Sequence, residues 1–466
     1  MSKTLPKSFQ GLPSEISNNQ ESLRQEKDWL EEQRNSPRLK RWVSFIIKGG
    51  PGYLQSALTL GGGTVTAMLF SGAVYGYQLL WVAPLSMLLG VIIFSAVSHQ
   101  TLSTGQRPFI SLKDHAGSFF AWAFAGGAVL SSIIWHFAQY SLGASVLVDL
   151  SEVVGMRMPS WLGGIIILGV SIMWAVTYGV SNKMRDWFEK SLRILVWGIV
   201  GCFGLVAFRT GIADPVELIF GFIPSLPESS SQVSSLTIIV GGLSASVGAN
   251  MLFLYPYSLM AKGWSSSHKQ LAQFDLIAGM FLPYFLATTL MVIATANIFY
   301  YGGIEFTGKS LSPFEASQVF ESTIGPLTGR IVFNLGILGM AISSIILQMI
   351  CCGFVALEVF GWEFGSIKYR LACLLPAPGV LGSVLWADIA FWAAVPTTVI
   401  CGFFLPVSYF GFIILQRSSS YLGKNKPKGL KADVWVGSMI LGTFILTIFL
   451  VWTLIDKIPK YLGNLF

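Results

Sequence analysis

Two glycine-rich stretches inside long apolar runs contain the residues best suited to bind a ligand. The first is Thr59-Leu60-Gly61-Gly62-Gly63-Thr64, and the second extends from Gly241-Gly242 through Gly248-Ala249-Asn250 to Tyr255-Pro256-Tyr257. Each glycine costs a helix about 1 kcal/mol relative to alanine, and proline removes a helical hydrogen bond. Both stretches are therefore predicted to interrupt a helix. The freed backbone offers carbonyl oxygens to a cation and N–H groups to an anion.

The candidate binding residues are those that form or flank the two interruptions. They are Thr59, Gly61, Gly62, Gly63, Thr64, Gly248, Ala249, Asn250, Leu252 and Tyr255. The alternative interpretation is that these glycines only let helices pack closely, as small residues commonly do in membranes.

A second polar candidate lies in another apolar run. His136 and Gln139 are three residues apart, so they share one face of a helix. Ionisable groups inside a membrane are functional candidates, and this pair is predicted to form a proton or polar-solute path. The alternative is a histidine whose ring is satisfied by a hydroxyl or carbonyl of a neighbouring helix.

Motifs of enzymes are missing from the sequence. It has no His-Glu-x-x-His pattern, no phosphate-binding glycine loop with Lys-Ser/Thr, and no carboxylate pair within an apolar run. The four histidines, His99, His115, His136 and His268, are too scattered to form a metal cluster. We therefore expect neither enzymatic activity nor a cofactor.

The composition is that of a membrane protein. Of 466 residues, 53% are hydrophobic and only 11% are charged, against roughly 25% charged in soluble proteins. This excludes a soluble enzyme, a nucleic-acid binder and a disordered chain. The net charge of +7 is attributed to cytoplasmic loops, and the expected partner is the lipid bilayer. The five cysteines all lie in apolar runs, so no disulfide is predicted.

Apolar runs long enough to cross a bilayer predict eleven helices after a polar tail of residues 1–45. They lie at about 48–73, 77–98, 118–146, 161–181, 188–208, 235–261, 272–299, 329–357, 371–387, 389–415 and 434–455. The ninth and tenth are separated mainly by Asp388. The transporter domain, 46–456, then comprises two groups of five spans at about 48–208 and 235–415, an extra helix at about 434–455, and a short tail, 457–466.

The charges of the loops predict the orientation. Loops after even-numbered spans are rich in basic residues, including Lys262, Lys368, Arg417 and Lys424. Loops on the other side carry about six basic residues and several acids, including Asp149. Because basic loops stay in the cytoplasm, we expect a cytoplasmic amino end, a carboxyl end on the opposite side, and a multi-pass protein of a bacterial-type plasma membrane, acting as a monomer.

The two interruptions occupy matching places, since each falls in the first span of a group of five. Paired broken helices are the best sequence indication of a transporter's binding site. Unwound backbone at the middle of a membrane must line a cavity or be buried in protein. The pattern therefore predicts a transporter.

Further motifs indicate a family. They are Gly50-Pro51-Gly52-Tyr53-Leu54, Tyr75-Gly76-Tyr77 leading into Leu79-Leu80-Trp81-Val82, Trp135, Ser151-Glu152-Val153-Val154-Gly155 after the third span, and Leu405-Pro406. With the glycine-rich break they make residues 45–455 resemble the Nramp family of divalent-metal transporters. The resemblance implies an all-α membrane protein with the LeuT-type 5+5 inverted repeat plus one extra helix, eleven helices in all, the first and sixth of them broken.

The site departs from the pattern of that family. The resemblance places the family's metal ligands on Gly61, Thr64, Ala249 and Leu252, where the family has Asp, Asn, Ala and Met. A glutamate of the third helix corresponds to Gln139. Shifting the alignment in the sixth span would bring in Asn250, Met251 or Tyr255, but no carboxylate.

Because the family's Asp, Asn and Met ligands are missing, the residues that would bind a metal are unknown. Three functions are then open. The first is an alternating-access transporter of divalent cations that are partly hydrated, such as Mg²⁺ or Mn²⁺, because neutral oxygens replace lost water poorly. The second is a transporter of a small zwitterionic or anionic solute, such as an amino acid, bound at the N–H groups of the first break. The third is a receptor on the same fold that transports nothing.

Overall fold

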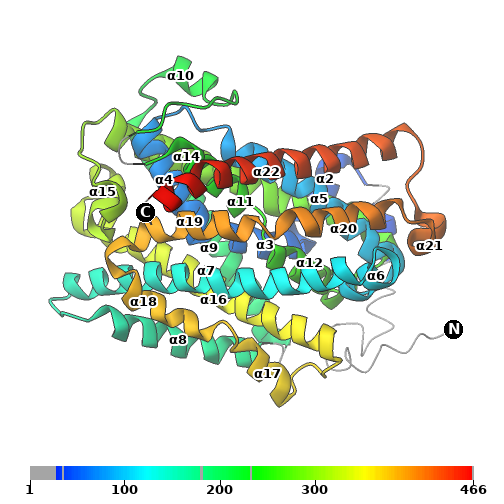
Figure 1. The fold of residues 1–466 in the computed structure, drawn as a ribbon. Coiled ribbons are helices and arrows are strands. Elements are labelled where there is room, and N and C mark those ends of the chain that lie inside the picture. The colour runs from blue at the N-terminus through cyan, green and yellow to red at the C-terminus, as the bar shows by residue number, and fades with distance from the viewer. Residues whose placement is uncertain (1–27, 34–35, 179–181, 231–232, 464–466) are drawn as a thin grey trace.

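The computed structural model describes residues 28–33, 36–178, 182–230 and 233–463 of the chain. These residues form helices and connecting turns, and none of them forms a strand. The long helices run side by side as one bundle (Figure 1).

The first half of the bundle contains six helices in chain order. They are α3 (Pro51–Thr59), α4 (Gly62–Tyr75), α5 (Val82–Thr104), α7 (Ser118–Val153), α8 (Ser160–Thr177) and α9 (Asn182–Thr210). Helix α2 (Arg38–Lys48) precedes them, so the last part of the predicted polar tail is helical. It carries basic residues near both ends and apolar residues such as Trp42 and Ile47 between them, a composition typical of an amphipathic helix at a membrane surface.

The second half contains the remaining spans. They are α11 (Ser235–Ala245) with α12 (Ala249–Ala261), α13 (Lys269–Asp275) continuing through π-helical turns into α14 (Leu282–Thr295), α16 (Pro326–Phe360), α17 (Ile367–Cys373) with α18 (Gly382–Leu385), α19 (Ala390–Gly402) with α20 (Leu405–Arg417), and α22 (Leu430–Gly463). Four shorter helices lie in the connections: α6 (Pro108–His115), α10 (Pro215–Phe220), α15 (Pro313–Ile324) and α21 (Ser419–Leu422).

The predicted number of spans is not settled by helix length and composition. Among the described residues, eight helices qualify as spans, or up to ten if each of two bent pairs is one span. The difference from eleven lies in residues 367–417, where short helices replace the predicted ninth and tenth spans. Figure 1 shows the chain passing from α17 to α18 along the bundle and returning through α19 and α20. The count of eleven stays a prediction.

The third span is longer than predicted. Helix α7 continues to Val153 instead of ending near 146, so Ser151 and Glu152 belong to the helix. The prediction ended the span early because it treated Asp149 as a loop residue. In the structure Arg330 of α16 pairs with Asp149 at 2.6 Å and with Glu152 at 3.1 Å. Helix α16 likewise extends to Phe360.

The connections gather at the two ends of the bundle. Helices α6 and α21 lie at one end and α10 and α15 at the other (Figure 1). His115 Nδ1 of α6 is 3.1 Å from Ser420 Oγ of α21. The predicted basic loops after the second and tenth spans therefore share an end, while the assignment of that end to the cytoplasm stays a prediction.

The centre of the bundle is made of the broken helices and two long ones. All nine residues of α3 are buried, and so are all eleven of α11. Helices α7, with 36 residues, and α16, with 35, pack along each other beside them. The candidate binding residues therefore lie at the core of the protein.

Candidate functional site

The first glycine-rich stretch interrupts its helix, as predicted. Helix α3 ends at Thr59 and α4 begins at Gly62, and the two axes differ in direction by 54°. Gly61 precedes α4 in an extended conformation, with φ −77° and ψ 179°, and no side chain caps the new helix. Consecutive glycines are poor helix formers, which explains why the chain leaves the helix here.

The second stretch also interrupts its helix, but more gently. Helix α11 ends at Ala245 and α12 begins at Ala249, with Ser246–Gly248 between them. The two pieces still qualify together as one span. Pro256 lies inside α12 and does not break it, so the interruption is confined to residues 246–248 and does not extend to Tyr255. Proline at residue 256 has no N–H to donate to the carbonyl of Leu252, yet α12 continues to Ala261.

The two breaks meet in the structure. The hydroxyl of Thr59 donates to the carbonyl of Gln55 at 2.7 Å and approaches the carbonyl of Ser246 at 3.4 Å. The Met251 sulfur lies 3.9 Å from the same hydroxyl. Across the first break, the Thr64 hydroxyl donates to the carbonyl of Thr59 at 2.5 Å. Thr59 therefore joins the two predicted binding segments.

Side chains from α7 and α16 close the first break from another direction. A Cβ built on Gly61 would lie 2.7 Å from Ser344 Oγ and 3.3 Å from Gln139 Nε2. A Cβ built on Gly62 would lie 2.9 Å from Gln139 Oε1 and 2.6 Å from a methyl group of Leu142. Gln139, predicted to lie on a separate polar path, is thus beside the first break.

His136 is placed differently from Gln139. Its Nδ1 lies 2.8 Å from the carbonyl of Ser132, one turn earlier in the same helix, and the ring contacts Tyr140. Because a carbonyl can only accept, Nδ1 carries the proton. The ring is fully buried. The carbonyl belongs to the histidine's own helix rather than to a neighbouring one, and Nε2 has no hydrogen-bond partner in the described part of the chain. Both the polar path and the histidine satisfied by a neighbouring helix therefore stay predictions.

The remaining glycines are also sites of close packing. A Cβ at Gly63 would collide with Thr398 of α19, and one at Gly248 would lie 2.9 Å from the ring of Trp135. The glycines therefore break the helices and also allow close approach, and their role in binding stays a prediction.

Three of the candidate residues contribute no side-chain polarity to the meeting point. Ala249 and Leu252 are fully buried and apolar. Tyr255 is turned toward α5, where its ring packs edge-on against Phe94 at 5.1 Å between centroids. Asn250 uses Oδ1 to accept from the N–H of Met251 at 2.9 Å.

Several buried polar atoms around the breaks have no hydrogen-bond partner in the described part of the chain. They are both amide atoms of Gln55, Gln139 Oε1, Asn250 Nδ2, Ser344 Oγ and Gln348 Oε1. Leaving such a group unsatisfied costs about 1–3 kcal/mol. A cluster of them is suited to contact water or a polar substrate.

Sequence reasoning missed Gln55 and Gln348 in this cluster. Gln55 is four residues before Thr59, and Gln348 is four residues after Ser344, so each shares a helix face with a polar neighbour. A search for polar residues at such spacing within the apolar runs would have found both.

The site contains neutral polar groups and no acid. The described residues include no group of three or more His, Cys, Asp or Glu side chains that could hold a metal ion. The buried Asp275 lies at the start of α3, where it accepts from the N–H groups of Gly50 at 3.1 Å and Gly52 at 2.6 Å. Arg193 donates to the carbonyl of Gly49 at 2.8 Å. These contacts position α3, and the acid does not reach the glycines of the break.

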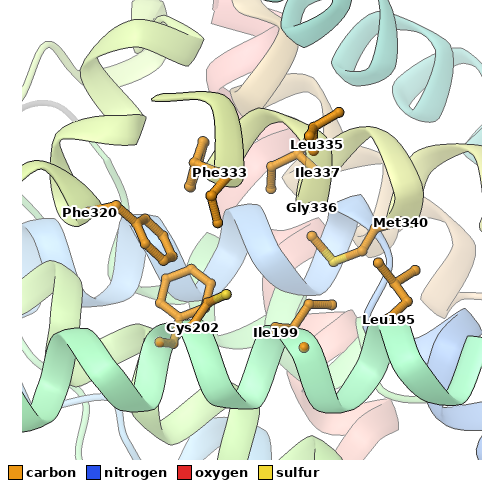
Figure 2. Close-up of a pocket in the computed structure, with 12 residues that line it drawn as sticks. Leu195, Ile199, Cys202, Phe320, Phe333, Leu335, Gly336, Ile337 and Met340 are labelled. Atoms are coloured by element: carbon orange, nitrogen blue, oxygen red, sulfur yellow. The ribbon is translucent and has the colours of Figure 1, made fainter. Parts of the chain in front are cut away.

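A separate apolar pocket lies between α9 and α16 (Figure 2). It has a volume of about 260 Å³ and is lined by residues such as Leu195, Ile199, Phe320 and Met340. This lining offers no charge or polar oxygen to an ion, so the pocket is unsuited to the chemistry of the breaks.

The chain is similar to known membrane transporters. Residues 52–453 match the family described as natural resistance-associated macrophage protein-like, or Nramp. The chain is 22% identical over 440 residues to Metal transporter Nramp6 of Arabidopsis thaliana, covering 87% of this chain and 77% of that protein. It is 23% identical over 456 residues to Divalent metal cation transporter MntH of Mesorhizobium japonicum, covering 94% and 95%.

Solved structures share the fold. The manganese transporter of Eremococcus coleocola, crystallised with an aromatic bis-isothiourea compound, superposes with a TM-score of 0.75 over 91% of this chain and 89% of that one, at 15% identity. MhsT in complex with L-phenylalanine gives a TM-score of 0.59 over 86% and 98%, at 15% identity. The all-helical LeuT-type fold is therefore confirmed. Since the family match covers most of its length, this chain belongs to the Nramp family of membrane transporters.

Proposed function

We propose that this protein transports a divalent metal cation by alternating access through the meeting point of its two broken helices. Relatives named as metal transporters and as divalent metal cation transporters support the substrate class. The observation that carries the proposal is the contact of Thr59 with Ser246, which joins the two interruptions at a buried, polar place.

The chemistry of the site limits which divalent cations it can bind. Thr59, Thr64, Asn250 and the freed carbonyls supply neutral oxygens only. Neutral oxygens compensate poorly for the removal of all water from a dication, whereas Mg²⁺ keeps several waters when it binds. The cation is therefore a hard one that enters with part of its hydration shell, such as Mg²⁺ or Mn²⁺.

Flux measurements in proteoliposomes test the proposal. We expect saturable uptake of Mn²⁺ or Mg²⁺ into vesicles that contain the protein and a metal-sensitive dye, and none into empty vesicles. Uptake should be lost when Thr59 is replaced by valine, which keeps the shape and removes the hydroxyl. Absence of uptake of either ion by the wild-type protein contradicts the proposal.

A second candidate is a small zwitterionic or anionic solute. The start of α4 favours a carboxylate, because no side chain caps it and Gly61, Gly62 and Gly63 add no side chains of their own. An amino acid that raises the unfolding temperature, together with no metal flux, would support this candidate. No stabilisation by any solute and no flux would instead support a receptor.

A further inference from the structure

The side-chain space at residue 61 is already occupied by two polar groups from other helices. A Cβ there would lie 2.7 Å from Ser344 Oγ, 3.0 Å from the carbonyl oxygen of Leu58 and 3.3 Å from Gln139 Nε2. Real Cβ atoms essentially never approach another heavy atom closer than 3.0 Å. Residue 61 therefore has no room for a ligand of its own, and α7 and α16 bring polar groups to the break instead.

Ser344 differs from the other hydroxyls nearby. A serine or threonine within a helix usually donates to a carbonyl of the preceding turn. Ser343 donates to Met340 at 3.0 Å, and Thr398 donates to Val395 at 2.6 Å. Ser344 Oγ has no partner among the described residues although the side chain is fully buried. Its hydroxyl is therefore available to a ligand at the break.

Gln139 is likewise buried and has a polar atom without a hydrogen-bond partner. The residue is only 5% exposed, and its Oε1 has no partner among the described residues. That oxygen faces Gly62, while the amide nitrogen faces Gly61. An amide oxygen and a hydroxyl from two helices thus converge on the two glycines that end the first break.

We propose that Gln139 and Ser344 are direct substrate ligands, which hold the cation from the α7 and α16 side in place of a side chain at residue 61. This inference rests on the function proposed above. An amide oxygen, a hydroxyl and backbone carbonyls are hard, uncharged donors, and they suit a dication that keeps waters in its remaining coordination positions. Weak binding and little preference for soft metals follow from this ligand set.

Two substitutions that keep the volume of the side chain test the ligands. Ser344→Ala and Gln139→Leu should each raise the KM for Mn²⁺ or Mg²⁺ uptake at least about fivefold. Ser343→Ala is the matched control, because that neighbouring hydroxyl is satisfied within its own helix; its KM should equal that of the wild-type protein. The inference is overturned if Ser344→Ala and Gln139→Leu retain the wild-type KM.

A gain of affinity separates a ligand from a structural residue. Gln139→Glu places a carboxylate of nearly the same shape beside the glycines, and it should tighten Mn²⁺ binding about tenfold or more, which misfolding cannot mimic. Unchanged or weaker Mn²⁺ binding by a folded Gln139→Glu protein rejects the ligand role. If the wild-type protein transports no divalent cation, both the proposed function and this inference fail. If the wild-type protein transports the cation and the Gln139 and Ser344 variants do so with unchanged KM and affinity, only this inference is overturned.

Discussion

Gly61 is tightly constrained by its neighbours. Its neighbours leave no space for a Cβ, and it adopts an extended conformation between two helices. The constraint is steric, because a φ of −77° is accessible to any residue. The residue thus makes space for ligands contributed by α7 and α16.

Gly61→Ala should therefore impair both stability and transport. The new methyl group meets Ser344 Oγ at 2.7 Å, and overpacking of a buried site costs about 1–3 kcal/mol. We expect a lower unfolding temperature in detergent and a large loss of uptake. Gly126→Ala in α7 is the control, since a Cβ there meets nothing within 4 Å.

A double substitution checks the cause of this effect. Gly61→Ala combined with Ser344→Gly removes the colliding hydroxyl, and it should recover much of the unfolding temperature. If the double variant is as unstable as the sum of the two single ones, the collision is not the cause.

Helix α3 is held at its start by charges rather than by a cap of its own. Asp275 accepts from Gly50 and Gly52, and Arg193 donates to Gly49 while its guanidinium stacks 4.4 Å from the ring centre of Tyr53. Nearby, Lys262 pairs with Glu189 at 2.8 Å. Helices α9 and α13 and the end of α12 therefore meet at the start of α3.

Asp275→Ala should loosen this end of α3. The change leaves two buried N–H groups without their acceptor, at about 1–3 kcal/mol each. Amide hydrogen exchange of residues 50–54 should accelerate by at least tenfold, while α16 keeps its protection. Asp433→Ala, which removes an exposed pair with Arg417, should change little. Unchanged exchange at 50–54 in Asp275→Ala would show that packing alone fixes α3.

The membrane-spanning helices present apolar side chains to the outside of the bundle. The connection that contains α10 also has exposed apolar side chains, although it lies beyond the ends of the spans. Around α10, Val216, Ile219 and Phe220 are each more than 60% exposed. The acids of this segment are used internally: Asp214 caps α10, and Glu217 accepts from the hydroxyl of Tyr301. Burial and that carboxylate raise the pKa of the Tyr301 hydroxyl.

The exposed apolar side chains and inward-facing acids of α10 predict that this helix lies in the membrane interface. Aliphatic and aromatic side chains that face outward while acids face inward are suited to lipid. A nitroxide attached to Ile219→Cys, in a Cys202→Ser background in liposomes, should be more accessible to oxygen than to a nickel chelate. Glu228→Cys, an exposed position of the same connection, should show the reverse. Greater nickel accessibility at residue 219 rejects the prediction, and dipolar broadening there would indicate a second copy of the chain.

The sequence by itself determined the properties that depend on local composition. Apolar runs define a polytopic membrane protein, and the glycines of 61–63 define a break, because helix propensity and transfer to lipid are properties of short segments. The motifs around Gly50-Pro51-Gly52 were enough to indicate the family. The missing carboxylate at the site was also visible without coordinates.

Only the tertiary structure decided which polar residues meet. Gln139 and Ser344 are 205 positions apart in the chain, as their numbers show, yet both reach Gly61. Asp149 was assigned to a loop until its pairing with Arg330 showed that a helix can contain it. Such contacts arise from the packing of distant helices, and the hydropathy of a segment contains no information about what lies opposite it.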